Sequence, residues 1–167
     1  MAKRLTVGQK IVHRRYGAGI IVELRGGKED EEHESYYVID IPSVALKVHF
    51  PVSADQGSSL RRISSKRTMR RALSVLSAEP HPLPKDYRER RALMQQSMSN
   101  GAVSDIAQVI RDLCGLRAVK KNKSTMELAM MTNAKRRLAG ELALVSDIDF
   151  PEALQCIEDA LQKNRED

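Results

Sequence analysis

The chain has 167 residues, of which 41% are hydrophobic and 30% charged, a balance that excludes a disordered protein and allows one or two small domains. Its formal net charge of +6 originates in residues 61–91, the basic window, which holds ten Lys or Arg against three Asp or Glu. With no signal-peptide pattern and no run approaching the roughly 18 apolar residues of a membrane span, we expect a soluble, cytoplasmic protein without a membrane partner.

The N-terminal region has the pattern of short β-strands. Five are predicted in under 60 residues, including residues 10–13, 20–24, 36–41 and 45–50, with a turn at 16–19 and a solvated loop over Gly26, Gly27 and the acidic stretch 29–34. In the strand 45–50, Leu46, Val48 and Phe50 share one face, and Lys47 and His49 share the other. Short strands joined at glycine corners predict a small β-barrel of the SH3 or Tudor type over residues 1–62.

From Ser64 onward the apolar residues recur with the period of an α-helix. Helices are predicted over residues 65–77, 85–98, 103–115, 125–145 and 150–163. Ser124 with Glu127, and Asp149 with Glu152, have the spacing of capping boxes, and the proline-rich stretch 79–84 forms a stiff connector. The fold class is therefore α+β with two domains, in which a small barrel is followed by an all-α domain over residues 63–167.

No arrangement of residues predicts catalysis or a metal site. The four histidines lie outside the predicted helical bundle, and none has a nucleophile at a recognisable spacing. Gly17 and Gly19 belong to a motif that lacks the third glycine and following helix of a dinucleotide loop. Cys114 and Cys156 have no ligand partners at zinc-site spacing. The sequence predicts a protein that is not an enzyme and needs no cofactor.

The basic window predicts a polyanionic partner, because neutralising neighbouring phosphates releases condensed counterions. One predicted helix surrounds the apolar stripe Met69, Leu73 and Leu76 with cations, and the next carries cations in its first two turns, where the helix dipole opposes them. The candidate DNA-binding residues are Lys66, Arg67, Arg70, Arg71, Lys85, Arg88, Arg90 and Arg91. The alternative is that these side chains lie on a solvated helix face and have no partner. That explanation suits any two of them, but it is weaker for the whole set.

Tyr87 lies inside the basic window, just after the proline-rich connector. An exposed aromatic ring there could stack on a base or wedge a base step. Alternatively, Tyr87 begins a stripe with Arg91, Met94 and Met98 and packs within the helical domain. The residues alone leave both interpretations open.

Four motifs stand in a distinctive order along the chain: VGQKIV at 7–12 with GAGII at 17–21, LKVHFPV at 46–52, IAQVIRDL at 106–113 and AGELAL at 139–144. In these motifs, and in its change from strands to helices, the chain resembles the CarD family of bacterial RNA polymerase-binding regulators, also called CdnL. The transcription-repair coupling factor shares the N-terminal module, but this chain is too short for its motor domains.

The resemblance implies a Tudor-like domain that docks on the β subunit of RNA polymerase and a helical domain that contacts promoter DNA at the upstream edge of the melted bubble. Bound there, the protein would support the open complex, with the sigma factor as a further candidate partner. The polymerase-binding residues implied are Lys47, His49, Arg25 and Lys28. Tyr87 stands where the family has a tryptophan wedge, with Arg88 and Arg90 as basic neighbours, whereas Glu89 and Ala92 interrupt positions that are often basic.

Two other classes of function remain open from the sequence. A general nucleic-acid-binding architectural protein would have the basic window but no polymerase partner. A Tudor-like reader of modified peptides would need an aromatic cage, for which Tyr16, Tyr36 and Tyr37 are the local candidates.

Overall fold

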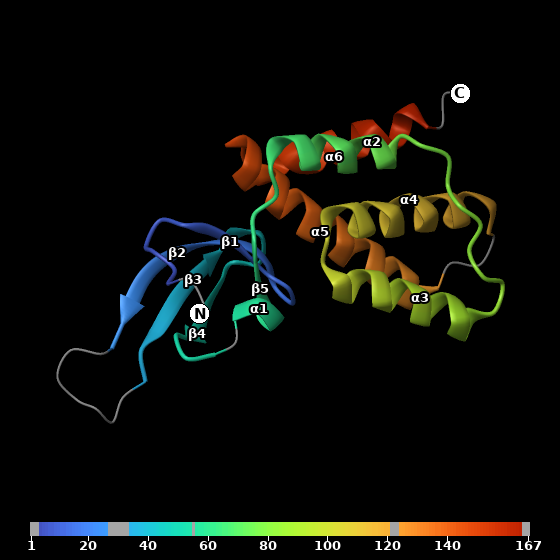
Figure 1. Cartoon of the computed structure of the whole chain (residues 1–167). Coiled ribbons are helices and arrows are strands. Elements are labelled where there is room, and N and C mark those ends of the chain that lie inside the picture. The colour runs from blue at the N-terminus through green and yellow to red at the C-terminus, as the bar shows by residue number, and fades with distance from the viewer. Residues whose placement is uncertain (1–3, 27–33, 55, 121–123, 165–167) are drawn as a thin grey trace. The chain divides into compact units, whose positions relative to one another are not determined.

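The computed structural model describes residues 4–26, 34–54, 56–120 and 124–164 (Figure 1). The chain divides into two compact units, Met1–Ile63 and Ser64–Asp167. The first holds an antiparallel sheet and the second holds helices, which confirms the predicted fold class of a β domain followed by an all-α domain.

The first unit, the sheet unit, is built on five strands. They are β1 Lys10–His13, β2 Gly17–Arg25, β3 Tyr36–Ile41, β4 Leu46–Pro51 and β5 Leu60–Arg62, with a 3₁₀ turn at Pro42–Val44 and a short helix α1 at Gln56–Ser59. The predicted turn at 16–19 is misplaced, because His13 pairs with Gly17 and the chain reverses over residues 14–16. Gly17 closes this reversal with φ of 108°, a value that favours glycine. Gly27 and the acidic residues 29–33 of the predicted loop lie outside the described residues.

The sheet is open, so the prediction of a closed barrel is wrong. The strand order is β4-β3-β2-β1-β5, which leaves β4 and β5 at the two edges. Closure would require a hydrogen-bonded ladder between the edge strands. In the described residues β5 contributes only Leu60–Arg62, and these residues pair with β1.

One face of the sheet carries the core of the unit. Ile21, Tyr37, Ile39 and Ile41 are fully buried there, and the Tyr37 hydroxyl accepts a hydrogen bond from the Leu5 N–H at 3.2 Å. Successive residues of a strand point to opposite faces. Tyr36 therefore points away from this core, and Tyr37 cannot share an aromatic cage with it. The described structure thus contradicts the cage that the peptide-reader alternative required.

The second unit, the helical unit, contains the five predicted helices. They are α2 Lys66–Leu76, α3 Tyr87–Asn100, α4 Val103–Val119, α5 Thr125–Ser146 and α6 Phe150–Lys163. The capping predictions are confirmed, since the side chains of Ser124 and Asp149 accept hydrogen bonds from the N–H groups of Glu127 and Glu152. None of the helices within the described ranges is both long enough and apolar enough to span a bilayer.

The start of α3 and the end of α4 differ from the predicted boundaries, and each difference has a structural reason. Helix α3 begins two residues later, because the Asp86 carboxylate accepts a hydrogen bond from the Glu89 N–H at 3.0 Å and caps the helix there. Helix α4 continues past Gly115, where the predicted helix ends. A Cβ atom on Gly115 would lie 2.5 Å from the Cβ of Pro80, so this glycine lets the connector pass close to the helix.

Helix α4 is the centre of the helical unit. Its residues Ile106, Ile110 and Leu113 are almost completely buried, and α2, α3 and α5 all pack on it. Helix α6 packs on α5 and α2. In Figure 1, α4 and α5 separate α2 from α3, so these two basic helices lie on different sides of the unit.

Candidate functional site

The outer face of the sheet, opposite the core, carries Glu23, Arg25, Tyr36, Lys47 and His49, together with Val38 and Asp40, which pair with His49 and Lys47. Directly paired residues of antiparallel strands share a face, and the register places these side chains together on β2, β3 and β4. The His49 ring stacks on Tyr36 with 4.9 Å between centroids and 19° between planes. Arg25 Nε lies 2.7 Å from Glu23 Oε1. The structure therefore brings Arg25, Lys47 and His49 onto one surface.

The charges of the outer face are coupled. The hydrogen bond from Arg25 holds the pKa of Glu23 below its ordinary value, and the charges of Arg25, Lys47 and His49 lower it further. The same hydrogen bond raises the pKa of Arg25. The paired side chains are about half exposed, so this ion pair contributes little to stability and can exchange for a partner's groups. Lys28 lies outside the described residues.

Helix α2 carries the first basic cluster, named here the α2 cluster, which consists of Lys66, Arg67, Arg70 and Arg71. All four side chains are exposed, and no acidic residue stands in the first turn of the helix. Within the described part of the chain, none of the four forms an ion pair. The opposite side of α2 is buried through Met69, Ala72 and Leu76. Leu73, which the sequence predicted for this apolar stripe, is only half-buried.

The second basic cluster, the α3 cluster, consists of Lys85, Arg88 and Arg91. These three side chains are exposed at the start of α3 and just before it. The α2 and α3 clusters are neighbours in the sequence, but their helices pack on different sides of α4 and α5 (Figure 1). The basic window therefore includes two separate surfaces of the helical unit, whereas its first residues, Arg61 and Arg62, belong to β5 of the sheet unit.

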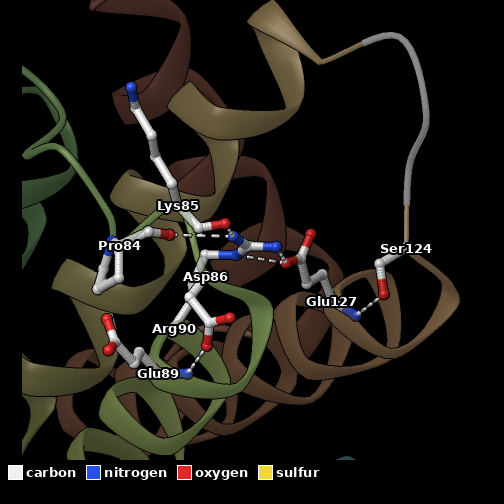
Figure 2. A network of polar contacts seen from close by, with 7 residues as sticks. All are labelled: Pro84, Lys85, Asp86, Glu89, Arg90, Ser124 and Glu127. Atoms are coloured by element: carbon white, nitrogen blue, oxygen red, sulfur yellow. Dashed lines mark hydrogen bonds and ion pairs between the residues drawn. The ribbon is translucent and has the colours of Figure 1, made fainter.

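Arg90 does not belong to either surface. Its side chain is only 3% exposed, and its Nε and Nη2 atoms both lie 2.6 Å from Glu127 Oε1 (Figure 2). Its Nη1 donates to the carbonyl oxygens of Pro84 at 3.0 Å and Lys85 at 3.2 Å. The structure does not support the predicted DNA contact of Arg90, because the guanidinium is buried and its donors are engaged within the helical unit.

The sequence contained a signal for this role that was missed. Arg90, Met94 and Met98 recur at intervals of four residues, which places the arginine on the buried face of α3. The stripe predicted instead included Arg91, which is exposed. Glu127 was assigned to a capping box, but its carboxylate binds Arg90 while its backbone N–H meets Ser124.

Tyr87 is neither a core residue nor a free surface residue. As the first residue of α3 it is 38% exposed, and the Cζ atom of Arg90 lies 5.6 Å from the centroid of its ring. A guanidinium at this distance attracts the ring face. The structure thus presents part of an aromatic ring to solvent beside the exposed cations Lys85 and Arg88.

No three His, Cys, Asp or Glu side chains among the described residues come together as metal ligands would. The arrangement supports recognition of partners by charge and aromatic contact.

Comparisons with known proteins agree with the division into two units. Residues 71–158 match the family model described as CarD, C-terminal domain, and residues 5–64 match the CarD-like/TRCF RID domain. The chain is also 25% identical over 142 residues to a Bacillus subtilis (strain 168) protein named "Putative transcription factor YdeB". That similarity covers 85% of this chain and 92% of the relative.

The burial of Arg90 predicts opposite behaviour for two adjacent arginines. Arg90→Ala leaves Glu127 buried without its partner and should lower the free energy of unfolding by about 3–5 kcal/mol. Arg91→Ala removes the same side chain from an exposed position and should change that free energy by less than about 0.5 kcal/mol. Urea unfolding followed by the helical circular dichroism signal measures both values. Equal losses for the two variants would contradict the burial of Arg90.

Proposed function

The chain belongs to the CarD family of transcription regulators, and from this premise we propose that its two units bind different partners. The sheet unit docks on the β subunit of RNA polymerase, and the helical unit contacts promoter DNA at the upstream edge of the melted bubble. Together these contacts stabilise the open complex. The observation that carries the proposal is the separation of surfaces, since a mixed-charge aromatic face lies on one unit and unpaired cations lie on the other.

The outer face of the sheet suits a protein partner better than DNA. Glu23 stays ionised among the cations Arg25 and Lys47, so the face is not uniformly positive. The stacked rings of Tyr36 and His49 add apolar area of the kind enriched in protein interfaces. A partner with its own acidic and basic groups can pair with both signs of charge, whereas a phosphate backbone would be repelled by Glu23.

The α2 and α3 clusters suit DNA. Their seven exposed cations are available to phosphates. A small number of such contacts gives weak, salt-dependent binding by the free protein. Docking on polymerase would supply the effective concentration that a weak surface lacks. This division of labour explains why one chain joins a protein-binding unit to a DNA-binding unit.

The docking proposal predicts that charge reversal on the outer face acts on polymerase alone. Lys47→Glu combined with His49→Glu should weaken binding to the isolated β subunit, because it repels acidic groups of the partner and removes the stack on Tyr36. The control is Lys66→Glu with Arg67→Ala, which changes the formal charge by the same amount on the helical unit. It should leave β binding unchanged and weaken DNA binding. A pull-down with β subunit that is insensitive to the first pair would contradict the proposal.

The DNA proposal predicts a salt dependence that separates the exposed arginines of the two units. Arg88→Ala or Arg91→Ala should each reduce the slope of log affinity against log salt by about one, because each variant neutralises one phosphate fewer. Arg25→Ala removes the same charge from the sheet unit and should leave the slope unchanged. Fluorescence anisotropy of labelled promoter duplex over a salt series measures these slopes. Tight, sequence-specific binding by the free protein would instead favour an architectural protein without a polymerase partner.

Tyr87 is proposed to hold its ring against an unstacked base step at the bubble edge. A base-to-aromatic stack is worth roughly 1–3 kcal/mol, so Tyr87→Ala should shorten the open-complex lifetime about fivefold or more. Tyr87→Trp should match or exceed the wild type, because its larger ring covers more of the step. Leu93→Ala is the control, since Leu93 is another exposed apolar residue of α3, at 47% exposure. Competitor-challenge kinetics measure the lifetimes, and equal lifetimes for the Tyr87→Ala variant and the wild type would contradict the wedge.

A further inference from the structure

The buried ion pair joins α3 to α5, and the same guanidinium also holds the residues just before α3. Arg90 stands in the second turn of α3, Glu127 stands in the first turn of α5, and the carbonyls of Pro84 and Lys85 end the connector (Figure 2). We infer that Arg90 and Glu127 are a positioning pair that sets the Tyr87 ring and the end of the connector before DNA is bound. This inference rests on the proposed function and names the residues that prepare its DNA-contacting edge.

The connector carbonyls account for an arginine at this buried position. A buried ion pair is weak support for stability, since apolar residues of similar volume often serve as well. An apolar side chain cannot bind the carbonyls of Pro84 and Lys85, which precede the cap residue Asp86 and lie outside the helix. The planar guanidinium offers several donors in a fixed geometry, and here Arg90 donates to two carbonyls and one carboxylate at once.

Glu127 is the anchor of the pair. Glu127 is fixed by the start of α5, where its backbone N–H donates to the Ser124 side chain at 3.4 Å. A carboxylate in the first turn of a helix is also favoured by the helix dipole. Farther along, α5 is held in the core by Met131, Ala134 and Leu138. Glu127 therefore presents its carboxylate from a rigid element, and Arg90 is held against that element.

The pair also meets Tyr87 through its guanidinium. The guanidinium that meets Glu127 on one side lies 5.6 Å from the centroid of the Tyr87 ring. Tyr87 and Arg90 are three positions apart on α3, so their side chains are neighbours on the surface of the helix. A ring that is held in place before binding loses less conformational freedom when it meets a base. The ion pair is thus expected to act on DNA binding without touching DNA.

The sequence provides a direct probe, because it contains no tryptophan. In the full-length Tyr87→Trp variant, the indole is the sole tryptophan, and its steady-state anisotropy and acrylamide quenching report its mobility without DNA. Adding Glu127→Gln, or replacing the pair by Arg90→Met with Glu127→Met, should free the ring. The mobile fraction should rise about two- to fivefold, the factor expected when a partly exposed cation–π interaction is removed. Arg91→Ala in the same background is the control and should change neither signal.

The methionine pair keeps the test decisive if Glu127→Gln does not fold, because it fills the volume of the ion pair with apolar groups. Thermal melting identifies the temperature range in which each variant is folded. In that range, the methionine pair in the Tyr87 background should also shorten the open-complex lifetime by about two- to fivefold, which is less than the effect of Tyr87→Ala. Arg90→Lys keeps the charge but loses the planar guanidinium. Its open-complex lifetime should lie between those of the methionine-pair variant and the wild type.

The outcomes separate this inference from the proposed function. An immobile indole in a folded methionine-pair variant overturns the positioning role, whatever Tyr87→Ala does. A mobile indole with a shortened open-complex lifetime supports it. A mobile indole with a lifetime unchanged by both the methionine pair and Tyr87→Ala overturns the role of Tyr87 at the bubble, and with it the function assigned to the pair.

Discussion

The burial of α4 is the constraint on which the helical unit depends. Ile106, Ile110 and Leu113 are removed almost completely from solvent, and each of α2, α3 and α5 contributes to that burial. Helices α2 and α3 cover α4 from different sides. The two basic helices therefore cannot merge into one patch, and the helical unit presents its cations on two surfaces (Figure 1). The glycine at 115 belongs to the same constraint, since it lets the connector between the two basic helices pack on α4.

Some arginines of the helical unit are buried and bind oxygens of the unit itself, whereas others are exposed to solvent. Their positions in the fold decide which of the two applies. Arg90, Arg111 and Arg137 are 2%, 4% and 7% exposed, and each donates to an oxygen of the unit itself. The cations of the α2 and α3 clusters are exposed instead. A buried guanidinium must meet acceptors, because an uncompensated charge inside the protein is strongly unfavourable. Net charge counted along the sequence therefore overstates the charge available to DNA, and Arg90 is the clearest example.

The two units would recognise their partners by different physics. The outer face of the sheet combines an ionised glutamate, cations and a stacked ring pair, which gives specificity through complementary charges. The basic clusters offer unpaired charge. Binding to DNA phosphates through such charge would depend on salt and would discriminate little between DNA sequences. Tyr87 adds a partly exposed aromatic ring beside the α3 cluster, and this ring lies 5.6 Å from the guanidinium of the buried Arg90.

The sequence by itself determined the features that depend on local pattern. Strand alternation at Leu46, Val48 and Phe50 and the helical period after Ser64 fixed the order of elements, and cap residues such as Ser124 fixed where helices begin. Local patterns suffice there because periodicity and capping involve residues within a few positions of each other. The family resemblance came from the same local motifs, and it was confirmed over both units.

Only the tertiary structure decided features that depend on contacts between distant segments. The sheet is open because its edge strands, β4 and β5, have no ladder between them in the described residues. The need for glycine at position 115 inside α4 follows from the approach of Pro80, and the role of Arg90 follows from Glu127 on another helix. A composition count treats Arg90 and Arg91 alike, since they are adjacent and identical. They differ because a one-residue step on a helix turns a side chain by about 100°. Here that step separates the buried face of α3 from its exposed face.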